Sequence, residues 1–199
     1  MHPTAARVTV FLVDDDHSTL DALGCLLRSA GYATKAYTSL KDFLDEDDPS
    51  VHGCAVLDLL GLNALDVQQE LANTGIDRPI IFLGGNGSVP ASMEAFKAGA
   101  VDFLIKPVQA AELLRAIKIA VKRDSNRLHL EAIVKRVNEL TPRERLVVTL
   151  VIRGMLDKQV ATALRIREIA VKASRCRAMK KLGVKNVAEL VRMTRKIPS

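Results

Sequence analysis

Short apolar runs alternate with segments of helical periodicity through the first two thirds of the chain. Apart from Thr9, residues 8–13, 54–57 and 80–83 are continuously apolar, which is the pattern of strands buried on both faces of a parallel sheet. Residues 33–37 and 101–105 supply two further candidate strands. Helical patterns follow the strands at 20–30, from 39, at 65–73, at 91–98 and from 110. Five strand–helix units predict an α/β fold with a doubly wound, parallel, five-stranded sheet.

The last third of the chain has helical periodicity only. The tetrapeptide 141–144, Thr-Pro-Arg-Glu, is a strong helix start, because Thr caps the first amides and Glu reaches back to the cap. Two helical segments at 157–164 and 168–182 are separated by a three-residue turn, which is helix-turn-helix spacing. A final helix begins after Asn186. The pattern predicts a small all-α four-helix domain of helix-turn-helix type.

The charge divides at nearly the same place. Residues 1–124 carry 11 Lys/Arg and 17 Asp/Glu, whereas residues 125–199 carry 18 and 6. All seven Phe and Tyr lie between Phe11 and Phe103, so the basic part has no aromatic side chain to stack on unpaired bases. We therefore expect an acidic domain, a linker continuing the last helix of that domain, and a basic domain. Their predicted ranges are 7–123, 124–140 and 141–197.

The cysteines and the apolar runs indicate a cellular compartment. Cys25, Cys54 and Cys176 lack metal-ligand spacing, and the first two lie in apolar segments, so we expect packed, reduced thiols. No apolar run approaches the roughly 20 residues that cross a bilayer, and the N-terminus lacks a signal-peptide core. We expect a cytoplasmic protein with no membrane partner.

Charged residues stand at the ends of three predicted strands. Asp14 and Asp15 follow the first strand, Asp58 the third and Lys106 the fifth, and the carboxyl ends of parallel strands converge on one crevice. Two carboxylates about 4 Å apart repel by roughly 4 kcal/mol at an effective dielectric of 20, so the cluster requires a cation. The three aspartates offer hard oxygen ligands for Mg²⁺. Lys106 would stabilise a phosphoryl group on Asp58.

Two other interpretations of these segments stay open. The aspartates, Asp16 above all, can be helix caps and solvated loop charge. The run Gly84-Gly85-Asn86-Gly87 could cradle a nucleotide phosphate, although it matches no fingerprint.

Three motifs of the first domain resemble the receiver domain of bacterial two-component response regulators. They are Val-Asp-Asp-Asp at 13–16, Leu-Asp at 57–58 and Ala-Gly-Ala-Val-Asp-Phe-Leu-Ile-Lys-Pro at 98–107. The resemblance implies a flavodoxin-like fold and a cis bond before Pro107. It also implies a role for each site residue: Asp58 as phosphoacceptor from a histidine kinase, Lys106 as phosphate partner, Phe103 as aromatic switch, and Asp14, Asp15, Asp58 and the Leu60 carbonyl as Mg²⁺ ligands.

Two positions depart from the receiver pattern. Gly84 stands where receivers carry Thr or Ser, whose hydroxyl moves onto the phosphoryl oxygen, and the loop after Asp58 is about two residues short. One hypothesis is a receiver that responds to phosphorylation. A second is a receiver that acts without phosphate, as a dimerisation or protein-interaction module. A third, a Mg²⁺-dependent α/β phosphate enzyme, lacks a separate base and a nucleotide fingerprint, so we expect no enzyme activity.

The basic domain resembles the LuxR-type four-helix DNA-binding domain over residues 138–197. The motifs are 140–144, 154–161, 171–172 and 179–193, and the whole chain resembles FixJ-type response regulators. The resemblance implies a transcription regulator that binds double-stranded DNA, with a final helix that helps homodimerisation. The predicted DNA-facing residues of the second helix of the motif are Lys172, Ala173, Cys176, Arg175 and Lys180, with Lys158, Arg165 and Arg167 at phosphates.

Two features of the helix 168–182 refine this prediction. At 100° per residue Val171, Ala178 and Leu182 share one face, which predicts the buried side. Arg175 lies at its edge, so it either pairs with Glu144 or contacts DNA. The two turn arginines should steepen the salt dependence of DNA binding.

Overall fold

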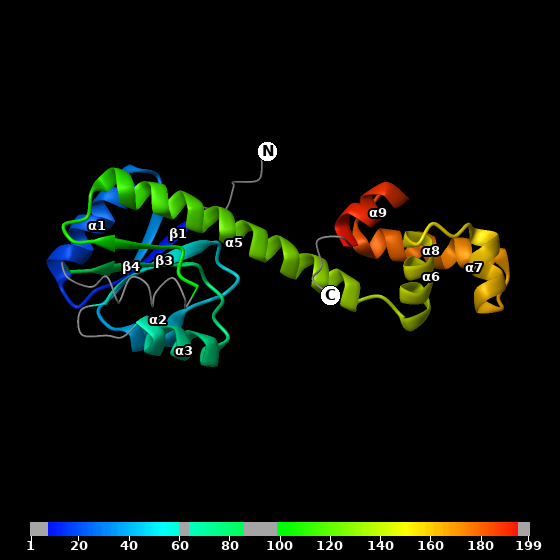
Figure 1. Ribbon diagram of the computed structural model, residues 1–199, viewed down its shortest axis with the longest axis horizontal. Helices are drawn as coiled ribbons and strands as arrows, with labels where there is room; N and C mark the ends of the chain where they lie inside the picture. The colour runs from blue at the N-terminus through cyan, green and yellow to red at the C-terminus, as the bar shows by residue number, and fades with distance from the viewer. Residues whose placement is uncertain (1–7, 60–63, 86–98, 195–199) are drawn as a thin grey trace. The chain divides into compact units, whose positions relative to one another are not determined.

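The first part of the chain folds as an α/β unit. The computed structural model describes residues 8–59, 64–85 and 99–194, which belong to two compact units, 1–126 and 127–199 (Figure 1). The predicted helix at 91–98 lies outside the described residues. The first unit holds the predicted parallel five-stranded sheet, and its strand order is β2-β1-β3-β4-β5. Its strands are β1 (Thr9–Val13), β2 (Ala33–Tyr37), β3 (Gly53–Asp58), β4 (Ile80–Gly84) and β5 (Asp102–Ile105).

Helices cover both faces of the sheet. Helices α1 (His17–Ser29) and α5 (Ala110–Asn138) lie on one face, and α2 (Leu40–Glu46) and α3 (Ala64–Thr74) lie on the other (Figure 1). Because side chains alternate along a strand, Phe11 belongs to the core on the α2 and α3 face, whereas Leu12 belongs to the core on the α1 and α5 face. Burial on both faces explains why the central strands β1, β3 and β4 are almost wholly apolar.

The cysteine prediction is correct at one of its two positions. Cys54 is fully buried in β3, and burial raises the pKa of its thiol to about 12. Cys25 is exposed, so the prediction of a packed thiol there was wrong. The apolar face of α1 is formed by Leu20 and Leu27, and at 100° per residue Cys25 lies about 140° from Leu20 and about 160° from Leu27.

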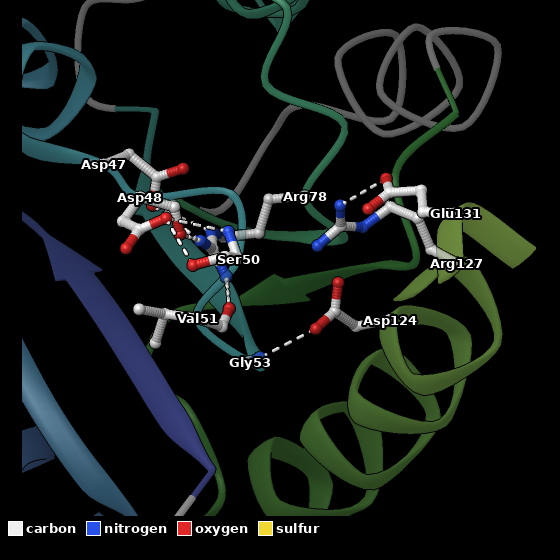
Figure 2. Close-up of polar contacts among 9 residues, drawn as sticks. All are labelled: Asp47, Asp48, Ser50, Val51, Gly53, Arg78, Asp124, Arg127 and Glu131. Atoms are coloured by element: carbon white, nitrogen blue, oxygen red, sulfur yellow. Dashed lines mark hydrogen bonds and ion pairs between the residues drawn. The ribbon is translucent and has the colours of Figure 1, made fainter. Parts of the chain in front are cut away.

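A buried arginine anchors the segment that leads into β3 (Figure 2). The Arg78 Nε donates to Asp47 Oδ1 at 2.9 Å, and its other nitrogens donate to the carbonyls of Asp48 and Val51 at 2.8 Å. Its guanidinium carbon lies 4.2 Å from the centre of the Phe11 ring. Because the arginine is only 4% exposed, water does not solvate its charge. The carboxylate, the two carbonyls and the aromatic face stabilise the charge instead.

Helix α5 holds the first residue of β3. The buried carboxylate of Asp124 accepts a hydrogen bond from the Gly53 amide at 2.8 Å (Figure 2). A Cβ at Gly53 would stand 1.8 Å from the Thr9 carbonyl oxygen, so only glycine allows β1 and β3 to approach this closely. These contacts fix the beginning of the strand whose other end is Asp58.

The second unit contains the predicted helices of the basic part. They are α6 (Pro142–Ile152), α7 (Asp157–Leu164), α8 (Glu168–Leu182) and α9 (Val187–Thr194). Thr141 and Glu144 form the predicted capping box, with bonds of 3.0 and 3.2 Å. The buried face of α8 comprises Val171, Ala178 and Leu182, as predicted, together with Ser174.

Helix α5 continues without interruption through residues 124–126 to Asn138. Among the described residues, no helix is long and apolar enough to cross a bilayer.

Candidate functional site

Three aspartates meet at the carboxyl ends of β1 and β3. Asp58 is the last residue of β3, and Asp14 and Asp15 directly follow β1. One carboxylate oxygen of each lies within 4.8 Å of those of the other two. Asp14 and Asp58 are buried, Asp15 is exposed, and all three line a hollow of about 260 Å³. The structure thus places these three residues together, as expected from the convergence of the carboxyl ends of parallel strands.

One oxygen of Asp58 is placed to bind a cation. Its Oδ1 is buried and has no hydrogen-bond partner among the described residues. A buried acceptor without a partner costs about 1–3 kcal/mol, and more when it is charged. Three carboxylates with an unsatisfied oxygen suit a small, hard divalent cation such as Mg²⁺. Leu60, the fourth predicted ligand, lies outside the described residues.

Lys106 bridges two of the aspartates. Its Nζ lies 2.9 Å from Asp58 Oδ2 and 3.0 Å from Asp14 Oδ2. Burial lowers the pKa of Lys106, but the hydrogen bonds to Asp58 and Asp14 outweigh burial and raise the pKa above its ordinary value. The Lys106–Pro107 peptide bond is cis, as the resemblance implied. The lysine is therefore held as a cation against the carboxylate of Asp58.

Asp16 performs a structural task. Its carboxylate accepts hydrogen bonds from the amides of Ser18 and Thr19 and from the Thr19 hydroxyl at 2.7 to 3.3 Å, and so caps α1. The Thr19 hydroxyl and the Ser18 amide lower the pKa of Asp16. The helix-cap interpretation is confirmed for this aspartate.

The aromatic ring of Phe103 lies against Gly84. A Cβ at Gly84 would lie 2.4 Å from Cζ of Phe103 and 3.1 Å from its Cε2. The half-buried ring therefore fills the room that a side chain at position 84 would need. Sequence reasoning singled out both residues, but it missed this contact because it depends on the pairing of β4 with β5.

The outer face of α8 presents the predicted DNA-facing residues. Lys172, Ala173, Cys176 and Lys180 are all exposed. Lys172 forms an ion pair with Glu168 at 2.9 Å, and this hydrogen bond raises the pKa of the lysine. Glu168 was missed, although its spacing of four residues from Lys172 on a helix is the signal for such a pair.

Of the two interpretations of Arg175, pairing with Glu144 is wrong. Arg175 lies 3.1 Å from Asp157, the first residue of α7, because α7 packs beside the middle of α8. Glu144 binds Lys181 at 2.7 Å and Arg177 at 3.5 Å instead. The last two turns of α8 face the start of α6, and Arg175 lies too early on the helix to reach it.

Four basic residues surround a hollow beside the turn of the helix-turn-helix. Lys158, Arg165 and Arg167 were predicted there, and Arg143 at the start of α6 joins them. The hollow measures about 740 Å³ and is open to solvent. Arg165 has the left-handed backbone conformation (φ 52°) that turns the chain from α7 toward α8.

A parallel sheet with an acidic crevice, followed by a helix-turn-helix, defines a receiver-type domain joined to a DNA-binding domain. Residues 10–118 match the family described as response regulator receiver domain, and residues 138–194 match the family described as bacterial regulatory proteins, luxR family. The chain belongs to the two-component response regulators with a LuxR-type DNA-binding domain, and it is a transcription regulator. The receiver implies interaction with a histidine kinase, and the second domain implies binding to DNA.

Similar proteins align along nearly the whole chain. Nodulation protein W of Bradyrhizobium diazoefficiens is 41% identical over 196 residues, which cover 96% of this chain and 86% of the relative. The structure of the response regulator StyR is similar with a TM-score of 0.73 and 38% identity, over 96% of this chain and all of that one. Full-length FixJ from B. japonicum is similar with a TM-score of 0.57 and 30% identity, covering 96% and 98%.

Proposed function

We propose that Asp58 accepts a phosphoryl group from a histidine kinase and that this event controls DNA binding. The observation that carries the proposal is the buried Oδ1 of Asp58, which has no hydrogen-bond partner in the described part of the chain and belongs to the carboxylate that Lys106 contacts. In the transfer, an Asp58 oxygen forms a bond to phosphorus while the bond from phosphorus to the donor histidine nitrogen breaks, and the nitrogen keeps the electron pair.

The neighbouring side chains support this chemistry. Asp14, Asp15 and Asp58 would hold Mg²⁺, with the Leu60 carbonyl as a further proposed ligand. The cation, when bound, supplies positive charge to the phosphoryl oxygens. Lys106 already lies 2.9 Å from Asp58, so its ammonium can interact with the negative charge of a phosphoryl group on that residue.

The regulated activity in this proposal is recognition of double-stranded DNA by a homodimer. The exposed face of α8, with Lys172, Ala173, Cys176 and Lys180, enters the major groove. Lys158, Arg165 and Arg167 contact phosphates, Arg143 joins them, and Arg175 positions α8 against α7 through Asp157. We propose a functional division into residues 7–123, a helical linker at 124–140, and residues 141–197.

A test of the acceptor uses acetyl phosphate as a small phosphodonor. The full chain should gain one phosphoryl group in the presence of Mg²⁺, Asp58→Ala should gain none, and Asp15→Asn should require more Mg²⁺. Asp16→Asn is the matched control, because asparagine caps a helix as well as aspartate does. Intact-mass spectrometry gives the extent of labelling, and duplex affinity is measured on the same samples.

The same samples separate the two receiver hypotheses. A receiver that acts without phosphate is favoured by the ring of Phe103, which already occupies the place above Gly84. If labelling is absent and Asp58→Ala binds DNA like the parent chain, the phosphate-independent hypothesis replaces ours. Gly84→Thr restores the missing hydroxyl. Labelling of that variant with an unchanged DNA response would remove the hydroxyl from the explanation.

A further inference from the structure

Ile169 is the most exposed large hydrophobic residue among the described residues, at 71% of its surface. It is the second residue of α8, and it is not among the described residues that form the core of the second unit. A single exposed isoleucine is common on protein surfaces, so exposure alone carries no conclusion. Its position on the helix does.

Ile169 shares the outer face of α8 with the proposed DNA-facing residues. At 100° per residue, positions 169, 172, 173, 176 and 180 fall within an arc of about 100°. Val171, Ser174 and Ala178 are buried on the opposite side. The outer face therefore carries an apolar strip, formed by Ile169, Ala173 and Cys176, between lysines.

The charges around this strip select the kind of partner. Lys172 and Lys180 lie on the same face, and Arg165 and Arg167 precede the helix. Glu168 adds one negative charge, which is already paired with Lys172 at 2.9 Å. A surface of this kind fits a polyanion that offers an apolar group between its charges. Duplex DNA does so in the major groove, where the thymine C5-methyl group projects.

We propose that Ile169, supported by Ala173, contacts a thymine methyl group in the major groove and so sets a preference for thymine in each half-site. The inference rests on the proposed DNA binding of α8 and adds a specificity-determining residue to it. The amino-terminal part of a recognition helix is the part that reaches base edges, which is where Ile169 stands.

The test removes one methyl group at a time. Binding sequences are first selected from a random duplex pool with the full chain, and each thymine of the selected site is then replaced by deoxyuridine. Burial of one methyl group changes affinity by about fourfold, so one thymine in each half-site should show a loss of that size. Ile169→Ala should bind the thymine and deoxyuridine duplexes equally well.

Leu156→Ala is the matched control, because Leu156 is 70% exposed but precedes α7 rather than lying on α8. This variant should keep the full sensitivity to deoxyuridine. Equal losses in Ile169→Ala and the parent chain would overturn the inference, as would no loss in the parent chain at any thymine. A change of oligomer size in Ile169→Ala, with thymine sensitivity retained, would assign the residue to a second copy of the chain. Failure to select any sequence would refute the proposed function instead.

Discussion

At position 84 the absence of a side chain has a steric effect as well as a chemical one. The Phe103 ring stands where a Cβ would be, with its Cζ at 2.4 Å, and the ring is only half-buried. A new side chain at position 84 therefore has to displace the ring. Gly84 and Phe103 are thus energetically coupled: a substitution at one position changes the free-energy cost of a substitution at the other.

We predict that Gly84→Ala lowers the free energy of unfolding by about 1–3 kcal/mol, the usual cost of overpacking. The same change in a Phe103→Ala background should cost much less, because the displaced ring is gone. The general effect of Gly→Ala on the unfolded chain cancels in this double-mutant cycle. Urea unfolding followed by tyrosine fluorescence is a suitable measurement, since Tyr32 and Tyr37 both lie in the first unit and the chain has no Trp. Equal costs in both backgrounds would contradict the coupling.

At the level of helices and strands, the local pattern of apolar and turn residues predicted several elements, including β2, which is half-exposed. The strand Ala33–Tyr37 and the helices Asp157–Leu164 and Glu168–Leu182 have the predicted ends. Strand β4 ends one residue later than predicted, at Gly84, because its pairing with β5 continues to Ile105. The pattern of apolar residues does not show which strands pair, so it could not predict this extension.

The contacts of the candidate site are likewise partly predictable from the sequence. Asp14, Asp58 and Lys106 were expected to converge because the carboxyl ends of parallel strands meet at one edge of the sheet, and the structure shows this convergence. The partner of Arg175 could not be predicted, because it depends on how α7 packs against α8. Ile169 was missed for another reason: an isoleucine is most often a core residue, and only its place opposite Val171 and Ala178 on α8 indicates that it is exposed.

Glu144 connects two helices and makes the second unit sensitive to acid. It is 3% exposed, belongs to the capping box of α6 and binds Lys181 of α8. The hydrogen bond from Lys181 and the one from the Thr141 amide lower the pKa of Glu144 to about 2. A carboxyl whose folded pKa lies below its ordinary value of 4.5 stabilises the fold fully above pH 4.5.

We therefore predict that the second unit loses stability between about pH 4.5 and pH 2, as Glu144 takes up a proton. Glu144→Gln should be less stable than the parent chain at pH 7, and the difference should shrink across this interval. Hydrogen exchange of α6 and α8 in the full chain, read by mass spectrometry, is the measurement. Glu112→Gln on α5 is a control in the first unit. A difference that stays constant with pH would show that the charge of Glu144 is not what stabilises the contact.

At the scale of the whole molecule, the charge is unevenly distributed between the two units. Residues 125–199 carry 18 Lys/Arg against 6 Asp/Glu, and four basic residues gather around the hollow beside the turn between α7 and α8. Each phosphate that such a residue neutralises releases condensed counterions, so binding weakens as salt rises. The slope of log affinity against log salt concentration is therefore a measure of the number of phosphate contacts that the basic unit makes.

We predict that Arg165→Ala and Arg167→Ala each reduce the slope of log affinity against log salt concentration by about 0.9, the value expected for one phosphate contact. Both variants should weaken binding to selected and random duplexes by similar factors, because phosphates carry no sequence information. Fluorescence anisotropy with labelled duplexes at several salt concentrations gives the slopes. Lys41→Ala on α2, an exposed lysine of the acidic unit, should leave the slope unchanged. A parent slope retained in Arg165→Ala would mean that Arg165 serves the turn alone, where its left-handed backbone conformation already places it.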